Sequence, residues 1–180
     1  NNSVSATIKL GSQDDTINLT GSHSGLIAKG NGDDDEFNVN SGFSGDGSFY
    51  GGKGFDTLNL KTTAKVALYG DKDDDNLVST ASTSTGASLF GGDGDDTIDL
   101  SGDANSSAKY TVKGEADDDS ILGSKGKDTI SGGDGDDNII GGNVAGGADS
   151  ISGDGGDDTI TETANTADSV YLGGDGDDTI

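Results

Sequence analysis

The chain contains no cysteine, proline, methionine, tryptophan or arginine in its 180 residues. The absence of cysteine excludes disulfide bonds and thiolate chemistry, and it leaves the redox compartment open. Aromatic residues make up 5% and all hydrophobic residues 28% of the chain, too few to cover both faces of a broad layered core. No apolar run approaches the roughly 18 residues that a membrane span requires, so we expect no membrane span.

Positive charge is also scarce. Ten lysines face 34 acidic residues, which gives a net charge of −24, and the only glutamates are Glu36, Glu115 and Glu162. A strand-rich fold that holds so many aspartates repels itself unless cations lie among them. Nucleic acids and anionic membrane surfaces are therefore poor partners for this chain.

Glycine and aspartate, in contrast, are abundant and occur in a regular unit. Residues 91–99 read GGDGDDTID, and the same letters return almost unchanged at 132–139 and 173–180. So much glycine and charge is typical of disordered segments, but a disordered tract has no reason to space its apolar residues regularly. The periodicity favours a folded repeat.

One aspartate per repeat precedes a pair made of a polar and then a large apolar residue, at spacings of 18 to 23 residues. A fixed period of about 20 residues indicates a repeat architecture, and a second short strand lies between successive copies. We predict an all-β fold, a right-handed parallel β-roll or two-strand β-solenoid of about nine coils of about 20 residues, forming one unit over 1–180. Each coil would bury its apolar face on its neighbours, in a thin core of stacked side chains.

The two rows of turns in such a coil differ. The first row carries the aspartate motif in every coil. The second row lacks it in the first five coils, including the turns expected at 22–25 and 45–47, and then gains an aspartate at Asp128, Asp149 and Asp168. One edge is therefore predicted to hold the motif along its whole length, and the other edge only in its last third.

The motif has the chemistry of a site for a hard cation. Glycines at alternating positions allow positive φ, which turns successive carbonyls toward one point. Neighbouring turns on one edge lie about 4.7–4.9 Å apart, so a cation between them can take oxygens from both. Ca²⁺ accepts 6–8 oxygens in flexible geometry, whereas Mg²⁺ demands a tight octahedron, and calcium is the predicted ion.

Residues 91–99 match the pattern G-G-x-G-x-D-x-U-x, and the chain resembles the RTX (repeats-in-toxin, haemolysin-type calcium-binding) family. The resemblance implies a calcium-bound parallel β-roll in a secreted, chiefly bacterial protein with about ten calcium ions here. It also implies that the carbonyls of the glycine turns are ligands, among them those of Gly91, Gly132, Gly153 and Gly173. The side-chain ligands it implies are Asp15, Asp35, Asp56, Asp75, Asp96, Asp119, Asp128, Asp137, Asp149, Asp158, Asp168 and Asp178.

Some turns depart from the pattern. Asp33, Asp73 and Asp117 stand where the fourth-position glycine belongs. Aspartate tolerates left-handed φ better than most residues, so we expect these turns to survive. The first copy, residues 11–15, has the fewest glycines and is predicted to be the emptiest site.

An enzyme is not expected. His23 is the only histidine, expected in an exposed turn, and it cannot form a histidine dyad. Acidic pairs such as Asp95 and Asp96 could imitate a glycosidase site, but they recur in every coil and not in one cleft. The tyrosines are expected to be packing or edge residues rather than a sugar-binding stripe: Tyr50, Tyr69, Tyr110 and Tyr171.

Two functions fit these observations. The favoured one is a calcium-dependent structural or assembly module of a secreted bacterial surface protein, such as an S-layer, sheath or adhesin. Its expected partners are calcium ions, further copies of itself in a lattice or filament, and cell-surface polysaccharide. The alternative is a calcium-triggered folding and secretion block of an exported enzyme or toxin. The chain begins at Asn1 and stops within a repeat at Ile180, so we interpret it as a segment of a longer protein, whose flanking regions would decide.

Overall fold

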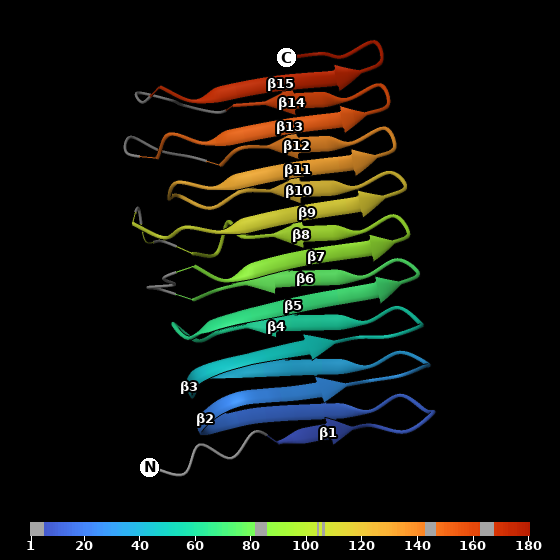
Figure 1. Cartoon of the computed structure of the whole chain (residues 1–180), viewed down its shortest axis with the longest axis vertical. Coiled ribbons are helices and arrows are strands. Elements are labelled where there is room, and N and C mark those ends of the chain that lie inside the picture. Colours follow the sequence, from blue (N-terminus) through green and yellow to red (C-terminus); the bar gives the residue numbers. More distant parts are fainter. Residues whose placement is uncertain (1–5, 82–85, 104, 106, 143–146, 163–167) are drawn as a thin grey trace.

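Fifteen parallel β-strands form one continuous sheet that winds into a solenoid (Figure 1). The computed structural model describes residues 6–81, 86–103, 105, 107–142, 147–162 and 168–180. These residues contain no helix, and hence no helix long and apolar enough to cross a membrane. The predicted all-β solenoid is confirmed.

The strands form two faces. The even face holds β4 (Thr57–Leu60), β6 (Asn76–Ser79), β8 (Thr97–Asp99), β10 (Ser120–Leu122), β12 (Asn138–Ile140) and β14 (Thr159–Thr161). The odd face holds β1 (Thr7–Lys9), β5 (Lys65–Lys72), β7 (Ser88–Asp93), β9 (Thr111–Ala116), β11 (Thr129–Asp134), β13 (Ser150–Gly155) and β15 (Val170–Asp175). In Figure 1 the odd strands run from left to right in the foreground and the even strands return behind them, which makes the coil right-handed as it rises.

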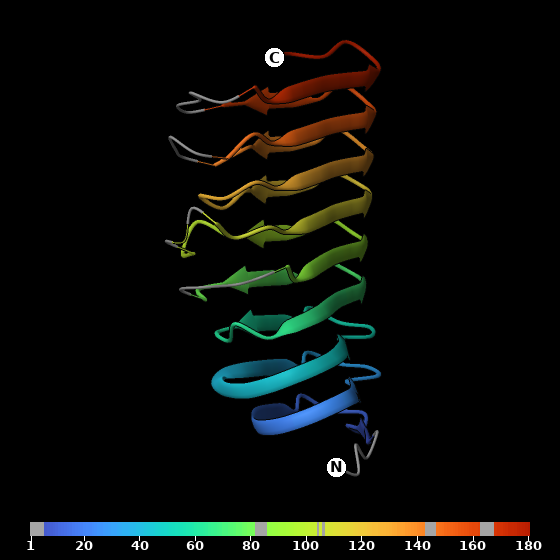
Figure 2. The same ribbon diagram turned by 60° about the vertical axis from the view of Figure 1, so that its left-hand side comes forward.

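The turns between the faces form two edges, which we name the glycine edge and the variable edge. The glycine edge joins each odd strand to the next even strand, and the variable edge joins each even strand to the next odd strand. The first two coils differ, because β2 (Thr16–Lys29) and β3 (Glu36–Tyr50) run through the variable edge without a break. The prediction that turns at 22–25 and 45–47 separate two strands is therefore wrong, because one strand continues through each of these segments. Gly21, Gly25 and Gly45 have positive φ, and register shifts between β2 and β3 absorb the bend (Figure 2).

The solenoid has about seven turns, fewer than the nine expected. Seven strand segments on each face have a neighbour on both sides, if the isolated bridge between Thr159 and Thr179 is included. The copies at the two ends, which hold β1 and β15, pair with another coil on one side only among the described residues.

Equivalent apolar residues stack in register because the glycine edge keeps a constant length, nine positions from Leu68 to Leu77 as from Leu89 to Ile98, and the variable edge takes up the differences in coil length. The even face contributes Phe37, Leu58, Leu77, Ile98, Ile121, Ile139 and Ile160. The odd face contributes Phe49, Leu68, Leu89, Val112, Ile130 and Ile151. All of them are buried, and outward residues alternate with them along each strand. The core is the thin double ladder that the sequence predicts.

The polar aromatic residues differ among themselves. Tyr110 is buried, and its hydroxyl donates to Asp103 Oδ2 at 2.7 Å. Tyr50 and Tyr69 lie on the outside of the odd face and stack face to face. His23 lies within β2, half-buried against Phe43 with the ring centroids 5.4 Å apart, so its expected place in an exposed turn is wrong.

Truncation of one rung of this core should be costly. Leu77 is fully buried between the side chains of neighbouring coils, and Leu77→Ala should lower the free energy of unfolding by about 2–5 kcal/mol, since a cavity remains. Urea denaturation at saturating calcium measures the change. The matched variant Leu172→Ala removes the same atoms from a side chain that is 58% exposed and should change stability by about 0.5 kcal/mol or less. Equal losses in the two variants would contradict a core of this kind.

Candidate metal centre

The turns of the glycine edge share one backbone geometry. We number six positions in each turn, from a first residue at the end of the odd strand to the aspartate before the even strand. From Gly30 onward, the second and fourth positions have positive φ in every turn, for example 136° at Gly92 and 126° at Gly94. Where aspartate replaces the fourth glycine the geometry is kept, with φ of 65° at Asp33, 70° at Asp73 and 75° at Asp117. The expectation that these turns survive is confirmed.

The sixth-position aspartates form a ladder along this edge. From Asp35 onward, Oδ1 accepts a hydrogen bond from the backbone N–H of the sixth-position aspartate one coil earlier, at 2.7–3.1 Å. We name this row the inner ladder: Asp15, Asp35, Asp56, Asp75, Asp96, Asp119, Asp137, Asp158 and Asp178. The structure thus brings nine of the predicted ligands into one line.

The second carboxylate oxygen of seven inner-ladder aspartates has no hydrogen-bond partner. Seven Oδ2 atoms are buried and unsatisfied, those of Asp35, Asp56, Asp75, Asp96, Asp119, Asp137 and Asp158. The one ion pair between described side chains, Lys72 with Asp93, lies exposed on the surface and does not reach them. Burial of a carboxylate oxygen without a donor or cation is strongly unfavourable. These atoms fit a bound cation.

A backbone carbonyl from the next coil points into the same space. A Cβ built on Gly91 would lie 2.1 Å from Asp96 Oδ2 and 2.7 Å from the carbonyl oxygen of Gly114. The same two kinds of oxygen surround the first-position glycine in each turn from Gly30 to Gly153. Only glycine leaves room for them.

The carbonyls that the resemblance implied as ligands all lie in this arrangement. They belong to Gly91, Gly132, Gly153 and Gly173, and each faces the Oδ2 of the inner-ladder aspartate one coil earlier. In the described residues no three carboxylate or imidazole side chains converge on one point. A site here would combine carboxylates with main-chain carbonyls, an oxygen-only set that suits Ca²⁺.

Burial raises the pKa of five inner-ladder carboxyls, from Asp56 to Asp137, well above the usual range for aspartate. The pKa rises to about 7 for Asp56, Asp96 and Asp137, and to about 8 for Asp75 and Asp119. Desolvation is the main cause, and nearby acidic side chains add to it. The backbone hydrogen bond from the preceding coil lowers each pKa but does not offset the burial. Without a cation, the fold therefore favours protons on these oxygens.

A second row of carboxylates, which the sequence reasoning did not identify, runs beside the first. In this row, which we name the outer ladder, Oδ1 of each fifth-position aspartate accepts a hydrogen bond from the backbone N–H of the fifth-position residue one coil later, at 2.7–3.3 Å. In the inner ladder the donor lies one coil earlier. The acceptors are Asp14, Asp34, Asp74, Asp95, Asp118, Asp136 and Asp157. Phe55 occupies the fifth position in its turn and is 60% exposed. The repeated aspartate doublet was the signal that could have revealed this row.

The first turn is built differently. Its first position is occupied by Leu10 and not by a glycine. The N–H of Leu10 donates to the carbonyl of Lys29, just as the N–H of Gly30, first in the next turn, donates to the carbonyl of Tyr50. The Oδ2 of Asp15 accepts the N–H of Gly11 at 3.0 Å, a hydrogen bond that the seven buried Oδ2 atoms lack. This contact gives a physical reason for the prediction that the first site is the emptiest.

The variable edge does not repeat this pattern. Both oxygens of Asp128 are hydrogen-bonded, Oδ1 by the N–H of Tyr110 and Oδ2 by the N–H and hydroxyl of Ser124. Asp149 is buried, and its Oδ1 accepts the N–H of Asp128 at 2.7 Å. Its own N–H, however, donates to the hydroxyl of Ser169, so Ser169 continues the row and Asp168 lies exposed one residue before it. The three aspartates of this edge have three different environments.

Comparison with known proteins identifies the repeat. Four stretches match the family model of the RTX calcium-binding nonapeptide repeat: 41–59, 88–106, 113–145 and 143–161. Separate searches of curated proteins and of solved structures gave no match.

The cradle around the first glycine can be tested by one methyl group. Gly91→Ala would place Cβ on Asp96 Oδ2, and we expect a loss of at least about 2 kcal/mol in the calcium-loaded state, because buried backbone and carboxylate must shift. Gly32→Ala is the matched control, since no atom lies within 4 Å of a Cβ there. Urea denaturation at saturating calcium compares them. A tolerated Gly91→Ala would contradict the convergence of these oxygens.

The raised pKa values predict how pH acts on the calcium-free chain. Folded carboxyls with a pKa of about 7–8, against an ordinary 3.8, bind more protons than the unfolded chain between these values. The free energy of unfolding is therefore greatest below about pH 4 and decreases as pH rises through 7–8. With calcium chelated, circular dichroism should show more β-structure at pH 5 than at pH 8.5. Greater β-structure at pH 8.5 would contradict the burial of these groups.

Proposed function

Since the chain belongs to the RTX calcium-binding repeat family, we propose that it is a calcium-dependent structural and assembly module of a secreted bacterial surface protein, of the S-layer, sheath or adhesin kind. RTX repeat proteins are typically secreted, which supports a place outside the cell. The observation that carries the proposal is the row of seven buried carboxylate oxygens without a donor.

Calcium would supply the positive charge that this row lacks. The residues that would hold it are the inner-ladder aspartates, through Oδ2, and the first-position glycines of the next coil, through their carbonyls. Each ion would then join two coils, so ion binding and coil stacking would be one equilibrium. In a calcium-poor cytoplasm the acidic chain stays unfolded, and it folds where calcium is plentiful.

A scaffold explains the sites better than catalysis does. Perturbed carboxyls normally mark an active site when they gather in one cleft. Here they recur once per coil along a straight edge, and the described side chains offer no unique cluster beside them. We therefore propose that the module is not an enzyme.

Assembly into a lattice or filament is part of this proposal, because stacked coils present the same edge at a regular spacing along one straight axis. Repeated surfaces of this kind suit contacts with further copies of the chain.

Calcium titration tests the folding role. We expect the chain to change from a disordered to a β-type circular dichroism signal in millimolar Ca²⁺, with at least seven ions bound by calorimetry. Asp96→Asn should lose one or two ions and about 2–3 kcal/mol of stability, since an ion at 100 times its Kd contributes about 2.7 kcal/mol. Asp46→Asn removes the same charge from an exposed position and should leave the ion count unchanged.

Light scattering and electron microscopy of the same samples test the assembly role, with ordered sheets or filaments as the expected result. A calcium-loaded chain that stays monomeric would overturn assembly and favour the folding and secretion block of an exported enzyme or toxin. A chain that folds equally well without calcium would overturn both.

A further inference from the structure

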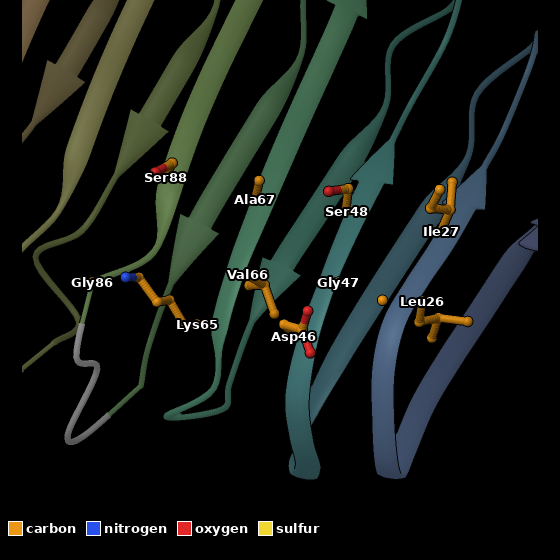
Figure 3. A pocket seen from close by; sticks show the side chains of 11 residues that line it. Leu26, Ile27, Asp46, Gly47, Ser48, Lys65, Val66, Ala67, Gly86 and Ser88 are labelled. Carbon is orange, nitrogen blue, oxygen red and sulfur yellow. The ribbon is translucent and has the colours of Figure 1, made fainter. Parts of the chain in front are cut away.

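The outer surface of the odd face carries a trough that runs along the solenoid axis. Two adjoining cavities of about 520 Å³ each share Lys65, Gly86 and Ser88 and together extend from β2 to β11. Figure 3 shows the first of them, with Ser48, Ala67 and Ser88 on neighbouring strands and the Lys65 side chain extending toward Gly86. We name this surface the lysine trough.

The floor of the lysine trough is a row of small and hydroxyl-bearing side chains in register. Ser48, Ala67, Ser88, Thr111 and Thr129 face outward, one from each successive coil. Successive residues of this row are separated by the spacing of parallel strands, about 4.7–4.9 Å. The floor therefore offers hydroxyl groups in line on four of five successive coils, with Ala67 as the exception.

One side of the trough is basic. Lys65, Lys109 and Lys127 precede the floor residues by two positions in three different coils, and all three are exposed. None of them forms an ion pair with a described residue. Asp46 is the one acidic side chain among the residues that line the two cavities. Three of the ten lysines of a chain with net charge −24 thus gather on one strip.

The other side of the lysine trough is lined by aromatic rings that stack on one another. Tyr50, Tyr69 and Phe90 lie two residues beyond the floor and stack on one another, with ring centroids 4.5 and 4.7 Å apart. The Lys29 ammonium covers the remaining face of Tyr50 at 4.6 Å. Recognition of single-stranded nucleic acid by stacking needs free aromatic faces, and both faces of Tyr50 and of Tyr69 are covered.

We propose that the lysine trough binds a linear anionic polysaccharide, which lies along the solenoid axis. Its carboxylate, sulfate or phosphate groups would face Lys65, Lys109 and Lys127, and its hydroxyls would bond Ser88, Thr111 and Thr129. The inference rests on the proposed surface function, and it assigns the polysaccharide partner a chemical class and a site. An extended polymer fits a straight trough with a hydroxyl floor better than the folded, turn-lined edge of a second copy does.

Calcium loading is a condition for this binding. Seven calcium ions carry fourteen positive charges, which would reduce the net charge from −24 to −10. These ions would also stack the coils that place the three lysines on one line. The unloaded chain would repel an anionic polymer and lack the trough.

Calorimetry with the whole 180-residue chain in 5 mM Ca²⁺ tests the proposal, with short oligomers of a polyuronate, dextran sulfate, a phosphate-linked glycan polymer and neutral dextran as probes. We expect binding to at least one charged probe, none to dextran, and weakening as salt is raised. The triple variant Lys65→Gln, Lys109→Gln, Lys127→Gln should bind at least tenfold more weakly. Ala67→Trp, which fills the floor and leaves charge unchanged, should also weaken binding at least tenfold. Lys53→Gln, on the glycine edge, should bind as the parent does.

Each outcome bears on the inference. The charged probe that binds most tightly identifies the anionic group, and loss in both trough variants with an unchanged calcium-induced β signal supports the site. No binding to any charged probe by a chain that folds normally with calcium would overturn the inference and leave the proposed function standing. Trough variants that bind normally but lose calcium-dependent self-association would also overturn it, in favour of a second copy as the occupant. Failure to fold with calcium would instead overturn the proposed function.

Discussion

The constraint on which this fold depends is a line of buried carboxylate oxygens that carry no hydrogen bond. Their presence explains why the first residue of nearly every turn on that edge is glycine, since a Cβ at Gly91 would occupy the place of Asp96 Oδ2. It explains the positive φ at alternating turn positions, which aims the carbonyls of the next coil at the same space. In the proposed function, cations bound between the coils would add stability that the thin core of a chain with 28% hydrophobic residues does not supply alone.

Both the glycine edge and the apolar core connect neighbouring coils, but through different interactions. Strand pairing and the double ladder of Ile, Leu, Val and Phe set the register, and they are indifferent to charge. The two aspartate ladders then connect every turn to both of its neighbours, because the inner ladder donates toward the following coil and the outer ladder toward the preceding one. Phe55 interrupts only the outer row, so the inner row is the one that continues through the described turns. In the proposed function, calcium would bind between the same turns that these hydrogen bonds connect.

The sequence predicted what local periodicity determines. The parallel solenoid, the stacked core and the nine aspartates of the inner ladder follow from a repeat of about 20 residues, and the left-handed aspartates such as Asp73 follow from backbone preference. What it missed depends on relations between coils. Whether β2 and β3 bend or break at the variable edge is decided by how two adjacent coils share their register shifts. The offset of Asp168 from its row, one residue from Ser169, cannot be seen from spacing alone. The outer ladder was hidden because a doublet of aspartates does not show which carboxylate faces inward.

The direction of the strands also determines how the molecule carries a load. The strands β1 and β15 lie at opposite ends of the long axis, and the backbone hydrogen bonds between coils run parallel to that axis (Figure 1). A pull between the ends therefore opposes the bonds of the outermost coil first and peels coils off in turn, without shearing the whole sheet. A released coil of about 20 residues extends by roughly 65–70 Å, where it had occupied about 4.8 Å. Under tension along its axis, the solenoid would therefore lengthen in steps, one coil at a time.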